Sequence, residues 1–542
     1  MSRDAIPVYQ LSGTLESNRL EQELPALVRQ IPDAYFQAQR WFGSKGKTVT
    51  RVRLKDAGFL QASPRVFLLC LVELELEGSG NEVYFLPLAL READRSTPTP
   101  DQALLKLQTG SQEFWVVDGF DEEGFRQALF QQIALGQSVP ALQGSYTFGH
   151  TQVLANFTGN SSSYPALTSR RVRVEQSNTS VIYGNAFILK GYRRLQNGPN
   201  PDLEVPLFIT TNSGFTSIPL VAGYVEYRGR DGFQASVSAM QNFVSNQGDG
   251  WQYSLGHLEE LYQRILESTS DTPSTTTPNN RQDTVKQLAE TYLRSAKHLG
   301  EVTAGMHQAL ATDADNPDFA AEPITDRDVG AWVADMQAFA ARALGELERA
   351  SRRYPAGLQE QVRQVAQSQS AYLNRIQGLS ALNAQQVNKI RHHGDYHLGQ
   401  VLKTLDGFVI LDFEGEPARP LAERRAKHCV LRDVAGMLRS FNYAAWTSAL
   451  DFAGSHQVDI ALLAPWAETW ERLACDAFIE GYLEAAPPGQ VGFLPGSRSA
   501  ADHIVTVFQL DKAMYEVLYE LNNRPDWLHI PLRYLLQSAV AI

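Results

Sequence analysis

The segment RHHGDYHLGQVLKTLDGFVILDFEGEP, residues 391–417, concentrates ligand-type side chains around a short apolar hairpin pattern. Asp406 and Gly407 form an Asp-Gly pair between the apolar runs 401–402 and 408–411. Such a pair between apolar runs is a strong signal for a two-residue hairpin turn. The segment is therefore predicted to fold as a β-hairpin with polar ends.

The register of this hairpin determines which polar side chains meet. Pairing outward from a two-residue turn places Leu405 opposite Phe408, and continuing the pairing brings Gln400 beside Asp412 at the open end. Two oxygen-bearing side chains there suit a hard cation such as Mg²⁺. Asp395 precedes the hairpin and supplies a carboxylate that can accept a proton.

This arrangement matches the chemical need of phosphoryl transfer, in which a base orients the acceptor hydroxyl and metal ligands neutralise the charge on the transferred phosphate. Kinases order these parts as an Asp, four intervening residues, an amide ligand, a hairpin and a second Asp. Asp395, Gln400 and Asp412 follow that order. Gln replaces the Asn of protein kinases, Gly394 replaces Arg, and Glu414 replaces Gly. The HGD opening indicates small-molecule kinases of the aminoglycoside-phosphotransferase type, and the alternative is a polar-ended structural hairpin.

Nucleotide-binding features are predicted upstream, in residues 173–190, RVEQSNTSVIYGNAFILK. This segment contains strand patterns that are separated by a polar turn and by a tight Gly-Asn turn. A polar loop there can lay backbone and hydroxyl donors over phosphates. Its predicted phosphate contacts are Ser177, Asn178 and Thr179, with Ser180 beside them. Lys190 would neutralise the α and β phosphates, and Glu204, in a predicted helix, is the acidic residue expected to pair with it. Considered alone, Lys190 would be a solvated lysine at a strand end.

A chain crossing is predicted in residues 233–251, FQASVSAMQNFVSNQGDGW, an apolar strand followed by a polar, glycine-containing connection. In a two-lobed kinase this position is the hinge, whose backbone contacts the adenine. The predicted hinge residues are Met240, Gln241, Phe243 and Val244. A buried strand is the structural alternative, and both interpretations can hold together.

Several longer segments closely resemble the maltokinase family. They are RWFGSKGK (40–47), QSNTSVIYG, ILK, RRLQNGPNPDLEV, NQGDGW, HHGDYHLGQVL, ILDFEGEPARPLAERRAKHCVLRDVAGMLRSFNYAA and DKAMYEVLYELNNRPDWLHIPL. The resemblance covers most of the chain and implies an enzyme that transfers phosphate from ATP to the anomeric hydroxyl of maltose, for α-glucan synthesis. It also implies Mg²⁺ as cofactor and trehalose synthase as a partner of related kinases.

The resemblance assigns roles to individual residues. It implies Asp395 as catalytic base, Gln400 and Asp412 as magnesium ligands, and Lys190 with Glu204 as the phosphate-holding ion pair. Around the disaccharide it implies Tyr443, Lys512 and Tyr519, whose chemistry suits a sugar because Tyr stacks on sugar faces and Lys donates to hydroxyls. Lys512 and Tyr519 are seven residues apart, which places them on one side of a helix and is also what a plain amphipathic helix shows. The charged turn 414–425 is expected to form a solvated face or local ion pairs, with Glu416 or Arg419 near the substrate as the alternative.

Composition limits the remaining possibilities. The chain has 542 residues, 43% of them hydrophobic and 20% charged, which is typical of a globular protein with several cores. Its formal net charge of -12 argues against nucleic-acid binding and against an anionic membrane surface. There is no long apolar run or signal-peptide pattern, and three cysteines make no disulfide framework. We therefore expect a cytoplasmic protein, a monomer or small oligomer.

The predicted fold class is α+β, a bilobal protein-kinase-like fold with an extra N-terminal cap and a mostly helical C-lobe. Three parts are expected: the cap in residues 1–130, the nucleotide-binding N-lobe in 131–245, and the helical C-lobe with catalytic loop and sugar site in 246–542. Two alternatives to a maltokinase stay open. One is a related sugar kinase with another acceptor, such as glucosamine, and the other is a catalytically silent kinase-like regulator.

Overall fold

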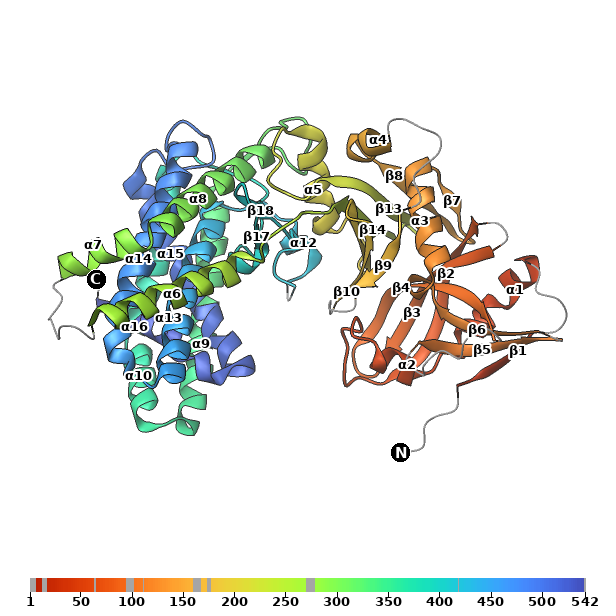
Figure 1. Ribbon diagram of the computed structural model, residues 1–542, viewed down its shortest axis with the longest axis horizontal. Coiled ribbons are helices and arrows are strands. Elements are labelled where there is room, and N and C mark those ends of the chain that lie inside the picture. The colour runs from red at the N-terminus through yellow and green to blue at the C-terminus, as the bar shows by residue number, and fades with distance from the viewer. Residues whose placement is uncertain are drawn as a thin grey trace. The chain divides into compact units, whose positions relative to one another are not determined.

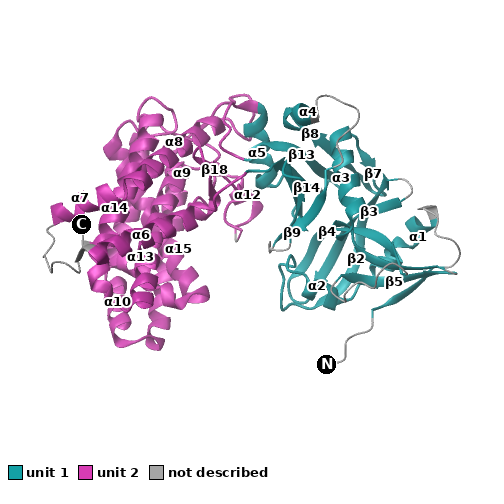
Figure 2. Cartoon of the chain, in the orientation of Figure 1, with its two compact units in different colours: residues 1–211, 219–244 teal, residues 212–218, 245–542 magenta. Residues whose placement is uncertain are grey.

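The computed structural model describes residues 6–11, 17–62, 65–93, 102–110, 112–158, 167–172, 177–269, 278–417 and 419–540. These residues form two compact units (Figures 1 and 2). Unit 1 comprises residues 1–211 and 219–244, and unit 2 comprises residues 212–218 and 245–542. Unit 2 resumes at Ser245, whereas the sequence places the start of the C-lobe at residue 246.

The first sheet of unit 1 has the strand order β1-β5-β6-β4-β3-β2, and β12 also pairs with β4. Its strands are β1 (Val8–Leu11), β2 (Val49–Ala62), β3 (Arg65–Leu76), β4 (Gly80–Glu92), β5 (Ala103–Thr109), β6 (Gln112–Asp118) and β12 (Arg194–Leu195). Strands β3 and β4 form a hairpin and pair antiparallel from Leu76 and Gly80 outward. Helices α1 (Ser17–Val28) and α2 (Asp33–Ala38) contribute apolar residues to the core of this sheet.

The second sheet of unit 1 has the order β7-β8-β13-β14-β11-β10-β9. Its strands are β7 (Val139–Pro140), β8 (Gly144–His150), β9 (Ser169–Val172), β10 (Asn178–Tyr183), β11 (Phe187–Tyr192), β13 (Val221–Gly229) and β14 (Gln234–Asn242). Helix α3 (Glu123–Leu135) packs on β8 and also on β2, so it joins the cores of the two sheets. The cap boundary predicted at residue 130 falls inside this helix. Helices α4 (Gln152–Thr158) and α5 (Pro201–Asn212) complete the unit.

Unit 2 is mainly helical, as predicted. Its helices are α6 (Gly250–Thr269), α7 (Pro278–Leu288), α8 (Glu290–Leu310), α9 (Asp326–Ala350), α10 (Ala356–Gln367), α11 (Gln369–Gln377), α12 (Leu421–Arg424), α13 (Leu431–His456), α14 (Ile460–Ala485), α15 (Arg498–Asn523) and α16 (His529–Val540). Helix α13 is buried along most of its length and contacts α6, α14 and α15. Helices α8 and α14 approach very closely at Gly481. A Cβ atom on this residue would lie only 1.9 Å from the Lys297 carbonyl oxygen, so the contact requires glycine.

Two short antiparallel strand pairs lie among these helices. One joins β15 (Glu322–Pro323) to β16 (Asn388–Lys389), and the other joins β17 (Val401–Lys403) to β18 (Phe408–Ile410). The second pair is the hairpin predicted from the Asp-Gly signal. Among the described helices, none combines the length and the apolar composition needed to cross a membrane.

Candidate active site

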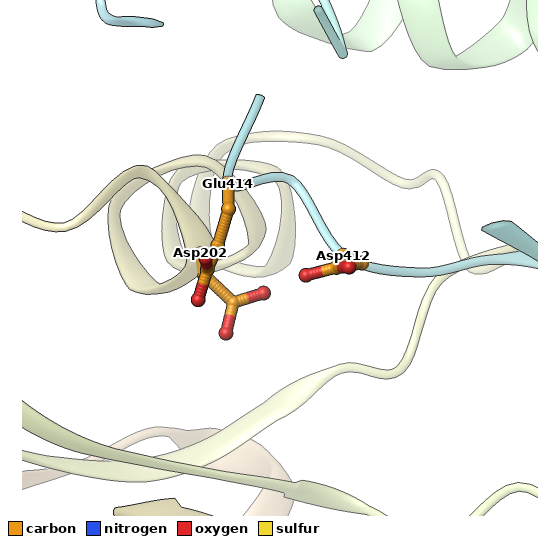
Figure 3. Close-up of side chains that lie close together, drawn as sticks. All are labelled: Asp202, Asp412 and Glu414. Atoms are coloured by element: carbon orange, nitrogen blue, oxygen red, sulfur yellow. The ribbon is translucent and has the colours of Figure 1, made fainter. Parts of the chain in front are cut away.

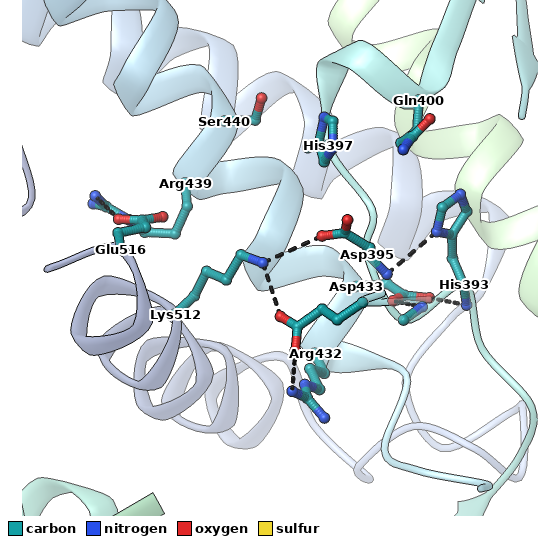
Figure 4. Close-up of polar contacts among 12 residues, drawn as sticks. His393, Asp395, His397, Gln400, Arg432, Asp433, Arg439, Ser440, Lys512 and Glu516 are labelled. Atoms are coloured by element: carbon teal, nitrogen blue, oxygen red, sulfur yellow. Dashed lines mark hydrogen bonds and ion pairs between the residues drawn. The ribbon is translucent and has the colours of Figure 1, made fainter. Parts of the chain in front are cut away.

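The loop that carries Asp395 is held by a buried carboxylate of helix α13. Asp433 accepts the backbone N–H of His393 at 2.7 Å and that of Gly394 at 2.9 Å (Figure 4). Gly394 has φ 84°, a conformation that favours glycine, which gives a structural reason for the HGD sequence. His393 Nε2 donates to the Leu411 carbonyl at 2.8 Å, so the loop is also bonded to the end of the hairpin.

Histidine neighbours keep Asp433 ionised. Burial alone would raise its pKa, but His392, His307 and His393 together hold the pKa below its usual range. His307 Nε2 lies 3.1 Å from the Asp433 carboxylate, and its Nδ1 lies 2.9 Å from the Tyr482 hydroxyl. His307 is therefore a buried residue that supports Asp433, and through it the loop that carries Asp395. The sequence interpretation missed Asp433. This residue lies 38 residues beyond Asp395 and contacts the loop that carries Asp395 only through tertiary packing.

Gln400 and Asp412 meet as predicted, although the predicted register was wrong. The strands pair Val401 with Ile410 and Lys403 with Phe408, so a four-residue connection, 404–407, replaces the two-residue turn. The displacement is two residues and therefore leaves each side chain on its predicted face. The Gln400 amide donates to the Asp412 carboxylate at 3.0 Å.

Asp412 has an uncommon backbone conformation, with φ 62°. Non-glycine residues in this region are rare and concentrate at functional sites, where the surrounding structure maintains them. Glu414 extends from the same segment two residues further on (Figure 3). The turn after β18 therefore presents two carboxylates from a constrained backbone.

Lys512 of helix α15 lies beside the candidate base. Its ammonium donates to Asp395 Oδ1 at 3.3 Å and to Glu416 Oε1 at 3.2 Å (Figure 4). Burial alone would lower the Lys512 pKa, but Glu416 and Asp395 raise it, so the side chain stays cationic. Glu416 is buried, and although burial would raise its pKa, Lys512, Arg432 and Arg419 lower it to about 2.

A cavity of about 410 Å³ in unit 2 reaches Asp395. All three residues predicted to surround the sugar, Tyr443, Lys512 and Tyr519, line it. The sequence interpretation did not include the other large side chains of its wall, which are Trp251, His397, Arg439, Tyr515, Glu516, Glu520, Arg524 and Trp527. Helical spacing along α15 could have indicated Tyr515, Glu516 and Glu520, and the PDW motif after that helix could have indicated Trp527.

One part of the cavity wall is fixed by polar contacts and stacking. Glu520 accepts from the Tyr443 hydroxyl at 3.1 Å and from Arg524 at 2.7 Å. The Arg524 guanidinium lies over the rings of Trp527, at 4.2 Å from the centroid, and Tyr519, at 5.1 Å. Cation–π contacts of this kind hold aromatic rings in place, so this part of the wall has a fixed shape before any ligand binds.

Lys190 of unit 1 has an acidic partner that the sequence interpretation did not select. Its ammonium donates to Asp202 at 2.9 Å, and Asp202 also accepts from the Tyr192 hydroxyl at 3.0 Å. Asp202 lies in the first turn of α5 (Figure 3). The expected partner, Glu204, lies two residues further along the same helix, and its role stays a prediction.

The polar loop ends earlier than predicted, because β10 begins at Asn178. Asn178 and Thr179 belong to β10, and residues 173–176 lie outside the described part of the chain. Thr179 is buried, and its hydroxyl accepts from Arg193 at 2.7 Å. Its side chain therefore helps to fix the strand, and its phosphate contact stays a prediction. Ser177 directly precedes β10, and its phosphate contact stays a prediction.

The predicted hinge coincides with the end of unit 1. Met240 and Gln241 lie in β14, where Met240 is buried in the core. Phe243 follows the strand and donates its backbone N–H to the Ala186 carbonyl at 2.8 Å. Val244 is the last residue of the unit. Adenine binding at these residues stays a prediction.

These features define the class of protein. A strand-rich unit with a lysine–aspartate pair precedes a helical unit with an HGD loop, a hairpin and a second aspartate. Together they form a kinase-like fold with an amino-terminal cap.

Comparison with known proteins agrees with this class. Residues 35–121 match the maltokinase N-terminal cap domain. Glucosamine kinase of Streptacidiphilus jiangxiensis is 25% identical over 388 residues, which are 70% of this chain and 74% of that protein. Glucosamine kinase of Mycolicibacterium smegmatis is 26% identical over 382 residues, 69% of this chain and 81% of that protein. A solved structure of glucosamine kinase with glucosamine, ADP and inorganic phosphate has a TM-score of 0.61 at 19% identity, covering 95% of this chain and 98% of that one.

Proposed function

We propose that the protein transfers the γ-phosphate of ATP to the anomeric hydroxyl of maltose, giving maltose 1-phosphate and ADP. The observation that carries this proposal is the aromatic-lined cavity of about 410 Å³ that reaches Asp395. Its size supports an acceptor larger than one sugar ring, and its position supports Asp395 as the group that receives the hydroxyl proton.

In the proposed mechanism, Asp395 accepts the proton of the anomeric hydroxyl as the sugar oxygen forms a bond to the γ-phosphorus. The bond between that phosphorus and the β,γ-bridging oxygen breaks, and ADP leaves. The Asp433 contacts hold the loop that carries the base, so the carboxylate is oriented before the sugar binds. Lys190, held by Asp202, binds the phosphates of the nucleotide.

The donor set at the end of the hairpin fits Mg²⁺. Gln400 supplies an amide carbonyl oxygen and Asp412 a carboxylate, which are ligands that this hard cation prefers. When bound, Mg²⁺ neutralises negative charge on the nucleotide phosphates. The constrained backbone of Asp412 supports this assignment, since such conformations are retained where a side chain must point in one direction.

The spacing along α15 supports a disaccharide. Lys512, Tyr515 and Tyr519 all line the cavity, so it follows the helix for about two turns, roughly 10 Å. A length of two helical turns suits two linked pyranose rings better than one. One ring at Lys512 would present its anomeric hydroxyl to Asp395, and the second ring would lie against Tyr519. Trehalose synthase, the partner implied by the family resemblance, would supply the maltose.

Phosphorylation of glucosamine is the second candidate, and two observations favour it. The two glucosamine kinases are homologues over about 70% of this chain. The cavity also contains the carboxylates of Glu516 and Glu520, which suit an ammonium group. Both carboxylates already bind arginines, however, Glu516 with Arg439 at 2.6 Å and Glu520 with Arg524 at 2.7 Å. This pairing weakens their attraction for an amino sugar and favours the neutral acceptor.

The deciding experiment measures ADP release by the purified protein with ATP and Mg²⁺. The acceptors are maltose, trehalose, glucose, glucosamine and an aminoglycoside, beside a no-sugar control. We expect ADP release with maltose. We also expect a product in which the ³¹P signal is coupled to the anomeric proton. Release with glucosamine instead would keep the kinase and replace the acceptor. Nucleotide binding without release for any acceptor would favour the regulatory alternative.

A further inference from the structure

The Lys512 ammonium makes two hydrogen bonds and one aromatic contact within the protein. The hydrogen bonds go to carboxylates, Asp395 Oδ1 at 3.3 Å and Glu416 Oε1 at 3.2 Å. The aromatic contact is with the Tyr515 ring, whose centroid lies 4.7 Å from Nζ. Two of the three donors of the ammonium are therefore bound to carboxylates that the protein itself supplies. These contacts give Lys512 a role in holding Asp395, and the sugar contact that the family resemblance implied for it stays a prediction.

Glu416 is fixed on its other side by arginines. Its Oε2 accepts from Arg419 Nε at 2.5 Å, and Arg432 lies 4.0 Å away. The Glu416 side chain is 7% exposed, against 22% for Asp395 and 25% for Lys512. The most buried carboxylate is therefore the most strongly held, and it provides a rigid anchor for the lysine. Buried, charge-assisted hydrogen bonds of this kind are stronger than exposed ones.

The anchor belongs to the segment that carries the candidate metal ligand. Glu416 follows Asp412 by four residues, and Asp412 holds the unusual backbone conformation described above. Through Lys512, this segment is connected to Asp395, a residue of a different loop. We name this chain of contacts the Glu416–Lys512–Asp395 bridge.

We propose that Lys512 and Glu416 are positioning residues: the Glu416–Lys512–Asp395 bridge fixes the orientation of the base relative to the turn that carries Asp412. The inference rests on the proposed function for the role of Asp395 as base. Because Lys512 binds Oδ1, the second carboxylate oxygen, Oδ2, is the one turned to the acceptor hydroxyl. Loss of the bridge lets the carboxylate rotate, which lowers turnover and leaves the sugar's binding surface in place.

A kinetic comparison separates positioning from sugar binding. The variants are Lys512→Met, Glu416→Gln and Lys512→Arg, and kcat and KM are measured for the active acceptor. We expect Lys512→Met to lower kcat by about 10- to 100-fold while KM changes by less than about threefold. Glu416→Gln should act in the same direction, and Lys512→Arg, which keeps the cation, should recover part of kcat. A raised KM with kcat retained in Lys512→Met would overturn the proposal in favour of a direct sugar contact.

Lys297 provides a matched control. It also links two carboxylates, Glu480 at 2.8 Å and Glu484 at 2.9 Å, but on α8 and α14 and outside the cavity. Lys297→Met should leave both kinetic constants unchanged. An equal loss of kcat in this control would show that removing any bridging lysine disturbs the unit, and would overturn the specific role of Lys512.

A second measurement needs no substrate. Thermal unfolding of Lys512→Met, Glu416→Gln and the double variant forms a double-mutant cycle. We expect the Tm of the double variant to fall by clearly less than the sum of the two single decreases, because each single change breaks the same contact. Additive decreases would refute the bridge. A wild-type protein that phosphorylates no sugar would refute the proposed function, and this cycle would still decide the ion pair.

Discussion

At the scale of single residues, Asp395 is the side chain on which turnover depends most. Asp395→Asn keeps the size and the hydrogen-bonding capacity of the side chain but removes the group that accepts the hydroxyl proton. We expect kcat to fall by a factor on the order of 10² or more, with nucleotide affinity nearly unchanged. Steady-state kinetics and nucleotide titration measure the two effects.

Asp406 provides the control for this substitution, because it lies exposed at the tip of the β17–β18 hairpin. Asp406→Asn should leave kcat and nucleotide affinity as they are. Near-normal turnover in Asp395→Asn would reject its assignment as base, whatever the acceptor.

Glu416 makes stability depend on pH in the acid range. Its pKa is lowered from 4.5 to about 2 because Lys512, Arg432 and Arg419 outweigh the effect of burial. A lowered folded-state pKa means that the contribution is complete above pH 4.5 and is lost as the pH falls toward 2. The shift corresponds to a contribution on the order of 3 kcal/mol.

Denaturant unfolding between pH 6 and pH 2 tests this dependence. The unfolding free energy of the wild type should fall more steeply below about pH 4.5 than that of Glu416→Gln, which cannot titrate. Parallel curves for the two proteins would contradict the ionised, ion-paired state of Glu416.

At the scale of elements, the β17–β18 hairpin shows what local sequence determines. The Asp-Gly signal predicted the hairpin and the face on which each side chain lies. It did not predict the length of the connection, in which Thr404 takes part. Its hydroxyl accepts from the Gly407 backbone N–H at 3.1 Å and its own N–H donates to the Gly407 carbonyl at 2.9 Å. These bonds close a four-residue connection, which turn propensities for a residue pair do not include. Gln400 and Asp412 still meet because strand faces repeat every two residues.

The strands that flank the predicted phosphate loop are held by one buried carboxylate at the end of β6. Asp118 accepts from Arg193 at 2.5 Å and lies 3.9 Å from Arg171 of β9. Arg193, fully buried, reaches Thr179 of β10 and lies over the Trp41 ring at 4.9 Å. The RWFGSKGK signature thus packs against the same arginine.

Asp118→Asn should destabilise the protein by about 3–5 kcal/mol, because it leaves Arg193 buried without its counter-charge. Thermal and denaturant unfolding measure this loss. Glu113→Gln is the control, since Glu113 forms an exposed ion pair with Lys106 at 2.5 Å on β5 and β6. A loss in Asp118→Asn no larger than in the control would show that Arg193 does not depend on this carboxylate.

At the scale of the whole molecule, the sequence predicted the kinase-like fold and the helical C-lobe but not how distant segments combine. Residues 212–218 belong to unit 2 although unit 1 continues on both sides of them, and Ser217 accepts the Ile410 backbone N–H at 2.8 Å. The cavity wall likewise draws Trp251, Tyr443 and Trp527 from three separate regions. Motif spacing reports residues that are close in the chain, whereas these contacts follow from the packing of α6, α13 and α15. Asp202 was missed for a related reason, since sequence alone does not show which acid of the first turn of α5 lies beside Lys190.

Ligand-induced stabilisation tests the acceptor for the whole chain independently of turnover. A ligand that binds the folded state alone raises the unfolding free energy by about 2.7 kcal/mol at 100 times its Kd. The Asp395→Asn variant keeps the cavity wall, and in it we expect maltose to raise the Tm and glucose to raise it less. A single ring cannot span the cavity from the end near Lys512 to the end near Tyr519. Trp527→Ala should reduce the response to maltose more than the response to glucose, since Trp527 lies in the wall with Tyr519. An equal effect on both sugars would argue for a single-ring site, and a response to glucosamine alone would make the amino sugar the acceptor.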